Sequence, residues 1–158
     1  MLKVFGILSS LAVIVVAGGA WAGTAVDNDM RRCAAGQGSS VLVTVRGVKA
    51  AAGKVRVQSY PATSSAWLNK GSWLNRIENQ AAAGAMTFCM PLPAAGNYGI
   101  AVRHDLNGNG KTDLRQDGGG FSNNPAISIF NLGKPSVTKA TFYAGEGVTR
   151  ITINLKYW

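Results

Sequence analysis

From residue 39 onward, apolar and polar positions alternate along the chain. Valines occupy every second position in residues 41–45 and again in residues 55–57, with mainly polar neighbours between them. Side chains of a β-strand point alternately to its two faces, so this period of two predicts strands with one buried face. The Ala-Ala-Gly that precedes Lys54 suits a hairpin-like connection between these two strands, and Pro61 ends the second one.

The same pattern predicts further strands downstream. One expected pair consists of residues 85–92 and 98–102, with the buried faces formed by Met86, Phe88, Met90 and Leu92 and by Tyr98, Ile100 and Val102. A second expected hairpin joins residues 137–144 to residues 148–157 around Gly145-Glu146-Gly147, and its buried face is formed by Ile151, Ile153, Leu155 and Tyr157. The short apolar run 126–130 is a candidate for one more strand.

About seven short strands, turns rich in glycine and proline, and no pattern of a long helix predict an all-β fold. We expect an antiparallel β-sandwich of the immunoglobulin-like or transthyretin-like kind, with a strand order that the pattern does not determine. Residues 62–80 break the alternation and contain Trp-Leu-Asn twice, beginning at Trp67 and Trp73. Two interpretations stay open: these tryptophans are ligand-stacking residues for sugar rings, or they cap one open end of the sandwich.

The first 22 residues have the three zones of a cleavable signal peptide. Lys3 provides the positive charge, residues 7–17 the apolar stretch and Ala20-Trp21-Ala22 the small-x-small cleavage site, so we expect cleavage between Ala22 and Gly23. A membrane-spanning anchor is the competing interpretation, but Gly18 and Gly19 dilute the apolar run. The expected organisation is a signal peptide (1–22), a flexible arm (23–38) and one domain (39–158) in a periplasmic or secreted protein, with no transmembrane segment after processing.

Charge narrows the set of partners without naming one. The chain has a net charge of +9, and loss of Lys3 with the signal peptide leaves +8. The basic residues are scattered, so the pattern is that of a solvated surface with a general attraction for a cell-envelope glycan or an anionic surface. No basic stripe interleaved with aromatic residues is present, and we expect no nucleic acid partner.

The two cysteines predict a disulfide. Cys33 and Cys89 are the only cysteines of the chain, and an even number in an oxidising compartment favours a bridge. The bridge would close a loop of about 55 residues, which the chain-entropy estimate values at roughly 4 kcal/mol. Its expected role is to hold the N-terminal arm, because neither cysteine belongs to a Cys-x-x-Cys redox pair.

One loop carries a pattern of oxygen ligands. Residues 105–113 place oxygen-bearing side chains at positions 1, 3, 5 and 9 of a turn, with glycine at position 6, as a calcium loop requires. The expected metal ligands are Asp105, Asn107, Asn109, Lys111 through its backbone carbonyl, and Asp113. Position 12 is Gln116 where a strong site has a bidentate glutamate, so the expected cofactor is weakly bound calcium or none. The alternative, an Asn-Gly turn whose side chains bond their own backbone, stays open.

A catalytic site is not expected. His104 is the only histidine, and beside Asp105 it suggests acid-base chemistry, for which Ser122 would be the conceivable nucleophile. Ser122 lacks the glycine two residues later that a nucleophile elbow requires, and a single histidine at the end of a strand is most often structural. A hydrolase using His104 is therefore the alternative to a non-catalytic protein.

The sequence resembles the bacterial family called domain of unknown function 2141. The resemblance is carried by Val41–Val45 leading into Gly53-Lys54-Val55, by Leu92-Pro93 before Gly96-Asn97-Tyr98, by His104–Lys111, and by Gly120-Phe121-Ser122-Asn123-Asn124. It implies an exported, single-domain β-sandwich protein with no assigned activity. Between the last two blocks, residues 113–119 replace a longer stretch that in the family typically carries a proline and a glutamate. From residues and resemblance together, we expect a non-catalytic binding or structural module, with a membrane-surface or acidic-glycan binder as a further alternative.

Overall fold

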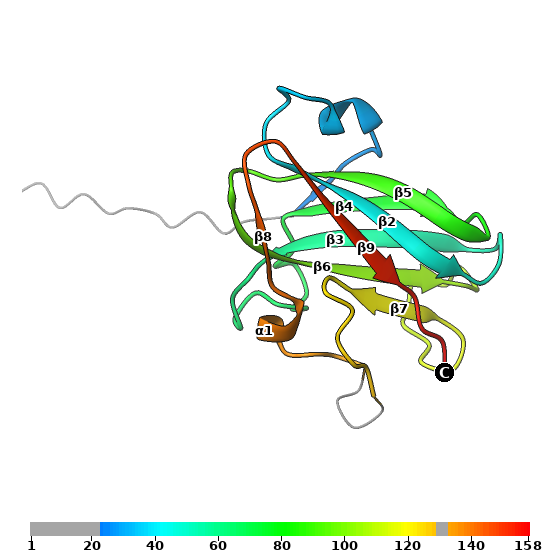
Figure 1. The fold of residues 1–158 in the computed structure, drawn as a ribbon. Coiled ribbons are helices and arrows are strands. Elements are labelled where there is room, and N and C mark those ends of the chain that lie inside the picture. The colour runs from blue at the N-terminus through cyan, green and yellow to red at the C-terminus, as the bar shows by residue number, and fades with distance from the viewer. Residues whose placement is uncertain (1–22, 129–132) are drawn as a thin grey trace, which may run out of the picture.

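A computed structural model of the chain describes residues 23–128 and 133–158 (Figure 1). The predicted signal peptide and residues 129–130 of the predicted strand 126–130 lie outside the described residues, and residues 126–128 are not in a strand. In chain order the elements are β1 (Thr24–Ala25), η1 (Met30–Cys33), β2 (Ser40–Val48), β3 (Lys54–Pro61), β4 (Asn75–Gln80), β5 (Gly84–Pro91), β6 (Gly96–Asp105), β7 (Gly118–Phe121), α1 (Val137–Ala140), β8 (Phe142–Ala144) and β9 (Val148–Asn154).

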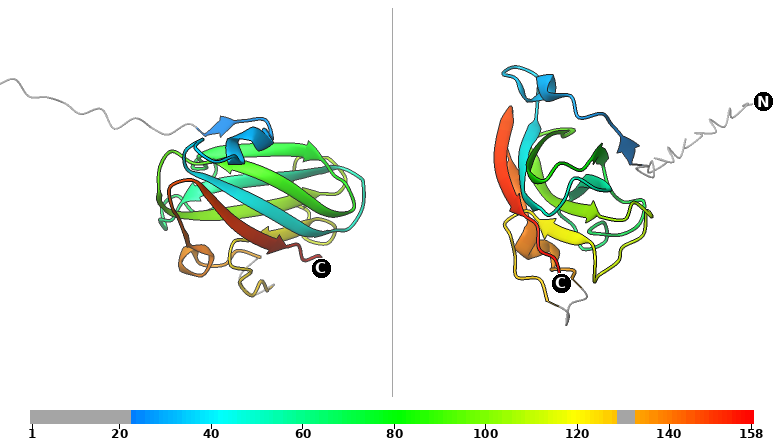
Figure 2. Two further views of the ribbon diagram at one scale, coloured as in Figure 1. Left: turned by 45° about the horizontal axis from the view of Figure 1, so that its top comes forward. Right: turned by 90° about the vertical axis from the view of Figure 1, so that its right-hand side faces the viewer.

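The strands form two sheets that face each other, which confirms the all-β prediction. The larger sheet has the order β1-β4-β3-β6-β7, with β8 also paired to β6, and the smaller has the order β5-β2-β9. The right-hand view of Figure 2 shows the two layers edge on. Most pairs are antiparallel as expected, but β1 with β4 and β2 with β9 are parallel.

The core lies between the two sheets and consists of the residues that the alternation placed on buried faces. Val41, Val43 and Val45 of β2 meet Val55 and Val57 of β3 there. The same cluster contains Phe88, Met90, Leu92, Tyr98, Ile100, Val102, Ile153 and Leu155, with Met86, Ile151 and Tyr157 packed against it. The period of two therefore identified the inward face of five strands correctly.

The three predicted strand pairs are wrong. Residues 41–46 and 54–58 belong to different sheets, as do β5 and β6, and as do β8 and β9. In each case the short connection passes from one sheet to the other instead of reversing within a sheet. Gly53 shows how tight one connection is: its φ is +68°, and a Cβ there would overlap the carbonyl oxygen of Asp105.

Besides the short β1, two strands of the larger sheet had no sequence prediction, and one predicted strand begins with a helix. β4 has a single fully buried apolar residue, Ile77, among polar neighbours, so it shows no alternation. β7 is Gly-Gly-Gly-Phe, which lacks side chains to show a pattern. The first four residues of the expected strand 137–144 instead form the short helix α1, which buries Ala140, and only Phe142–Ala144 form the strand β8.

Residues 23–38, expected as a flexible arm, carry β1 and the 3-10 turn η1. The predicted disulfide is present: Cys33 is bonded to Cys89 of β5, with Cα atoms 5.8 Å apart. β1 pairs in parallel with the start of β4 at Asn75 and Arg76. The N-terminal segment is thus attached to both sheets, to one covalently and to the other by hydrogen bonds.

Asparagine side chains occupy both edges of the smaller sheet. Asn28 bonds the edge of β5, with its Nδ2 3.0 Å from the Thr87 carbonyl and its Oδ1 2.9 Å from the Cys89 N–H. Asn124 bonds the edge of β9 in the same way, at 2.9 Å from the Thr152 carbonyl and 2.8 Å from the Asn154 N–H. Each amide takes the place of a neighbouring strand at an edge that would otherwise present free backbone groups.

Among the described residues, no helix has the length and apolar character needed to cross a bilayer.

Candidate calcium loop and adjacent pocket

The loop that follows β6 is held by the carboxylate of Asp105. Its Oδ2 accepts a hydrogen bond from the Gly110 N–H at 2.8 Å and lies 3.3 Å from the Arg103 guanidinium. Asp105 is 5% exposed, and its buried Oδ1 has no hydrogen-bond partner among the described residues. The carboxylate therefore closes the loop with one oxygen and leaves the other unpaired.

The two asparagines of the loop both bond their own backbone and converge on one acidic residue. Asn107 and Asn109 each accept the N–H two residues later, at 3.0 and 2.8 Å. Their amide groups donate to the same oxygen of Asp113, at 2.8 and 2.7 Å. These two hydrogen bonds hold the pKa of the Asp113 carboxyl below its usual value, with a further contribution from nearby Lys111.

Of the five expected metal ligands, the structure joins Asn107, Asn109 and Asp113 by direct hydrogen bonds. Asp105 bonds Gly110 of the same turn, and Lys111 donates its backbone N–H to Asn109 there. The turn bonds that the alternative interpretation expects are present at Asn107 and Asn109. Each bonded side-chain carbonyl oxygen keeps a second lone pair. Within residues 23–128 and 133–158, no group of three or more histidine, cysteine, aspartate or glutamate side chains is arranged to hold a metal ion. Asparagine and backbone oxygens are outside that set.

Asp117 is a buried loop residue that the sequence analysis missed. Its Oδ1 accepts from the Leu106 N–H at 3.1 Å and its Oδ2 from the Asp113 N–H at 3.0 Å. This carboxylate joins the first and last turns of the loop, next to the position where a calcium loop has its closing glutamate. The available signal was an acidic residue directly before a run of three glycines, Gly118–Gly120.

Arg103 connects the loop to the outer face of the larger sheet. One of its terminal nitrogens donates to Thr112 Oγ1 at 2.9 Å, and the other donates to the Gly110 carbonyl at 3.1 Å. With the Asp105 contact, the guanidinium spans three parts of the loop. A change in the loop that moved any of these oxygens would also move Arg103.

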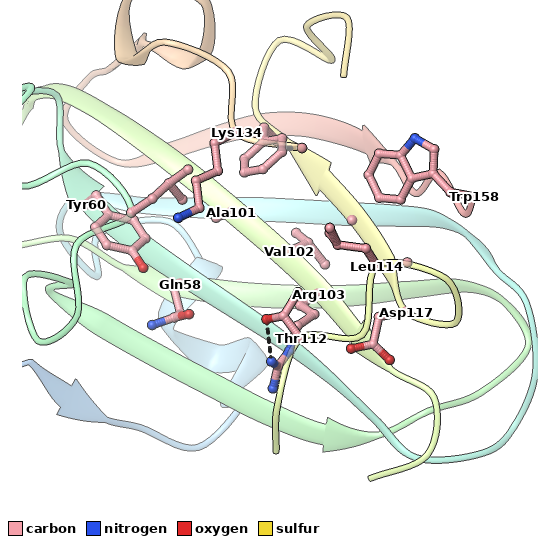
Figure 3. Close-up of a pocket in the computed structure, with 15 residues that line it drawn as sticks. Gln58, Tyr60, Ala101, Val102, Arg103, Thr112, Leu114, Asp117, Lys134 and Trp158 are labelled. Carbon is pink, nitrogen blue, oxygen red and sulfur yellow. Dashed lines mark hydrogen bonds between the residues drawn. The ribbon is translucent and has the colours of Figure 1, made fainter. Parts of the chain in front are cut away.

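A pocket of about 290 Å³ opens beside the loop, on the sheet face that points away from the core (Figure 3). Small residues form its floor: Ala101 of β6 and Gly119 of the neighbouring strand β7 face the pocket there. Tyr60 and Gln58 lie at one end, and Trp158 and Leu114 lie at the other.

The three glycines of β7 have two different functions. A Cβ at Gly118 would lie 2.5 Å from the Tyr157 ring, and a Cβ at Gly120 would lie 2.7 Å from the Ile153 side chain. The lack of a side chain at these two positions allows the C-terminal segment to pack closely. A Cβ at Gly119 would meet nothing nearer than the Trp158 ring at 3.9 Å. No neighbouring group therefore requires a glycine at position 119, and the missing side chain leaves the pocket floor open.

Comparison with known proteins identifies the family of this chain. A model of the family described as "Uncharacterized protein conserved in bacteria (DUF2141)" matches residues 43–152. The chain belongs to this family. No curated protein and no solved structure matches the chain.

Two blocks that carried the resemblance to DUF2141 lie on either side of the pocket region. The block 104–111 forms the end of β6 and the loop, and the block 120–124 ends β7 and contains the asparagine that bonds the β9 edge. Ser122 lies within the second block, where its hydroxyl accepts from the Ile100 N–H at 3.0 Å and donates to the Ala140 carbonyl. The second block therefore links β6, α1 and β9.

His104 is fully buried and bonded at both ring nitrogens. Its Nε2 lies 2.7 Å from the Ala52 carbonyl, and its Nδ1 lies 2.7 Å from the Tyr157 hydroxyl. The carbonyl can only accept, so Nε2 carries a proton, and a neutral imidazole accepts from Tyr157 at Nδ1. Tyr157 in turn accepts from the Lys49 N–H at 3.0 Å. The imidazole has no contact with Asp105 and forms part of a structural network.

The two candidate stacking residues lie in different surroundings. Trp67 is buried against Tyr60 and Phe121, and its indole N–H donates to the Pro135 carbonyl at 2.8 Å. Trp73 is partly buried, with the Arg76 guanidinium 4.3 Å from its ring centroid. Trp67 is therefore unsuited to stacking, and one contact of the Trp73 ring is taken by Arg76. Trp158, which the sequence pattern did not single out for stacking, is 44% exposed at the rim of the pocket.

Proposed function

We propose that this member of DUF2141 is an exported, non-catalytic binding module of the cell envelope whose 105–117 loop binds calcium. The proposal takes the two facing sheets as an immunoglobulin-like or transthyretin-like sandwich. Support for export comes from the pattern of residues 1–22 and from the Cys33–Cys89 disulfide, because such bonds persist in oxidising compartments.

One observation carries the calcium proposal: Asp105 Oδ1 is buried and has no hydrogen-bond donor. An unpaired buried carboxylate oxygen is unfavourable, and a cation next to it would offset the lost hydration. The opposite oxygen already accepts from the Gly110 N–H, so the carboxylate is fixed in the turn. Calcium prefers hard oxygen ligands, and Asn107 and Asn109 place two more such oxygens in the same turn.

We expect weak affinity. One carboxylate oxygen of Asp113 already accepts hydrogen bonds from two amide groups, so it is less available to a metal ion. Arg103 and Lys111 also place positive charge near the loop. A low count of free carboxylates places the site in the range of extracellular calcium modules, with a Kd on the order of 0.1 to 1 mM.

The alternatives from the sequence have less support. A hydrolase would need His104 to reach a substrate, but its two ring nitrogens bond Ala52 and Tyr157 inside the core. A membrane-surface binder would need several exposed tryptophan rings, but Trp67 is buried and Arg76 lies over Trp73. Trp158, at 44% exposed, is left as a single candidate. No observation favours either alternative over a binding module.

The test is a calcium titration by calorimetry of the oxidised protein purified after export. We expect saturable binding in the submillimolar to millimolar range, weakened at least tenfold in Asp105→Asn. Asp27→Asn is the matched control, because Asp27 is exposed and lies outside the loop. Absence of binding at 10 mM calcium, or equal binding by the Asp105→Asn variant, would refute the proposal.

A further inference from the structure

We propose that the pocket over β6 and β7 binds a uronic-acid unit of an acidic polysaccharide. The site is the hollow lined by Gln58, Tyr60, Thr112, Leu114, Lys134 and Trp158, with Ala101 and Gly119 as its floor. The inference rests on the proposed function only in taking the protein as a binding module exported to a compartment that contains such glycans.

The first argument is a set of polar groups without protein partners. The amide of Gln58, the hydroxyl of Tyr60 and the ammonium of Lys134 all line the pocket, and among the described residues none of the three has a hydrogen bond or an ion pair. Figure 3 shows Gln58 and Tyr60 at one end of the pocket and Lys134 extending over it. Polar groups that converge on a hollow without bonding each other are suited to a polar ligand.

The second argument is the apolar rim on the opposite side. Leu114 and Trp158 are 47% and 44% exposed, and both line this pocket. A pyranose ring has an apolar C–H face that packs on an indole, while its hydroxyl groups bond polar side chains. Leu68 and Phe121 add apolar surface near Tyr60, so the pocket combines apolar contacts with a few polar groups, as a sugar ring requires. The volume of about 290 Å³ is near the lower end of the range for small-ligand sites, which suits one sugar unit.

The third argument is charge, which favours an acidic sugar over a neutral one. Lys134 is exposed and has no carboxylate partner in the part of the chain that the structure describes, whereas Arg103 bonds the loop. The one acidic residue of the lining, Asp117, has each oxygen occupied by a backbone N–H. A ligand carboxylate at Lys134 would form a charge-assisted hydrogen bond, and the net positive charge of the protein would attract a polyanion.

The test uses the exported, oxidised protein and three uronate oligosaccharides: tetragalacturonate, oligomannuronate and a hyaluronan tetrasaccharide. Binding is measured by calorimetry in 150 mM salt, and the methyl-esterified tetragalacturonate serves as the uncharged match. We expect saturable binding of at least one uronate, and at least tenfold weaker binding of its methyl ester. Lys134→Ala should weaken uronate binding about tenfold. Trp158→Ala should weaken the binding of the uronate and of its methyl ester by a similar factor, because Trp158 contacts the sugar ring that both share.

Two further variants separate the pocket from surface charge. Gly119→Leu should fill the floor and abolish binding, and a thermal melt shows whether the variant folds. Lys70→Ala is the matched control, since Lys70 is the one charged residue in a different hollow of about 720 Å³. The inference is overturned if no uronate binds at 10 mM, or if binding survives both Gly119→Leu and Lys134→Ala. Calcium binding at Asp105 is measured separately, so failure here leaves the proposed function intact.

Discussion

At the level of single residues, His104 and Asp105 are neighbours in the sequence that face opposite sides of β6. His104 points into the core toward Tyr157, and Asp105 points outward to Gly110 and the loop. Successive side chains of a strand alternate between faces, so a strand cannot bring these two groups together. The suggestion of an acid-base pair came from adjacency alone, and the strand geometry separates the two residues.

Tyr157→Phe is expected to destabilise the protein without changing its fold. Loss of the hydroxyl leaves His104 Nδ1 buried without a donor, which costs about 1–3 kcal/mol in the free energy of unfolding. Denaturant unfolding measures the difference, with Tyr143→Phe as control because Tyr143 is 65% exposed. Equal stability of Tyr157→Phe and the unmodified protein would show that the network contributes nothing.

The same tyrosine predicts a pH dependence. Burial raises the pKa of Tyr157, and the Lys49 N–H opposes this shift only in part. An unfolded tyrosine ionises near pH 10, so the contribution is fully present below about pH 10 and is lost as pH rises through the higher folded pKa. Unfolding between pH 9 and 12 should therefore show a smaller loss of stability in Tyr157→Phe. A steeper loss in the variant would contradict this account.

At the level of elements, the sequence predicted which residues face the core but not which strands pair. Val57 and Val102 were placed correctly on inward faces, yet each predicted pair joined strands of opposite sheets. Alternation reports only burial, whereas pairing depends on whether a connection turns within a sheet or crosses to the other. β7 was missed for a related reason, because Gly118–Gly120 have no side chains to alternate.

The candidate site was predictable only in part. The oxygen positions of residues 105–113 revealed the loop, since its ligands are close in sequence. Asp117 was missed because its partners, Leu106 and Asp113, depend on how the loop folds back. The pocket combines β3, β6, β7 and the C-terminus, so no local pattern could show it.

Asn28→Ala is expected to release the edge of β5. The substitution removes two hydrogen bonds to the backbone of Thr87 and Cys89, which together contribute about 1–3 kcal/mol. An uncovered edge also favours strand addition between molecules, so light scattering on mild heating should increase. Asn69→Ala is a suitable control, because the Asn69 side chain bonds only the nearby Ser65 carbonyl. Unchanged stability and scattering in Asn28→Ala would show that this edge needs no cover.

At the level of the whole molecule, the loop, the pocket and the core meet around β6. Arg103 holds the loop, Ala101 forms the pocket floor, and Val102 between them faces the core. If calcium binds the loop as proposed, it should stabilise the folded protein, because the unfolded chain lacks the turn. With a Kd near 1 mM, 10 mM calcium adds about 1.4 kcal/mol to the free energy of unfolding.

For a domain of this size we expect a rise in Tm of roughly 4–7 °C. The melt is compared with Asp105→Asn, which should show no rise. Magnesium at the same concentration should have a smaller effect, because it demands a stricter octahedral geometry. An equal rise for both proteins would assign the effect to general ionic strength.

The most direct measurement of the central claim is a calcium titration of the oxidised protein, followed by nitrogen-15 NMR. We predict saturable shifts of the backbone amides of residues 105–117, with smaller shifts at Arg103 and in β7, and none of them in Asp105→Asn. Two results would contradict a calcium-binding loop: shifts scattered over exposed acidic residues such as Asp27 and Glu146, or no shifts at 10 mM calcium. Either result would identify residues 105–113 as a self-bonded Asn-Gly turn.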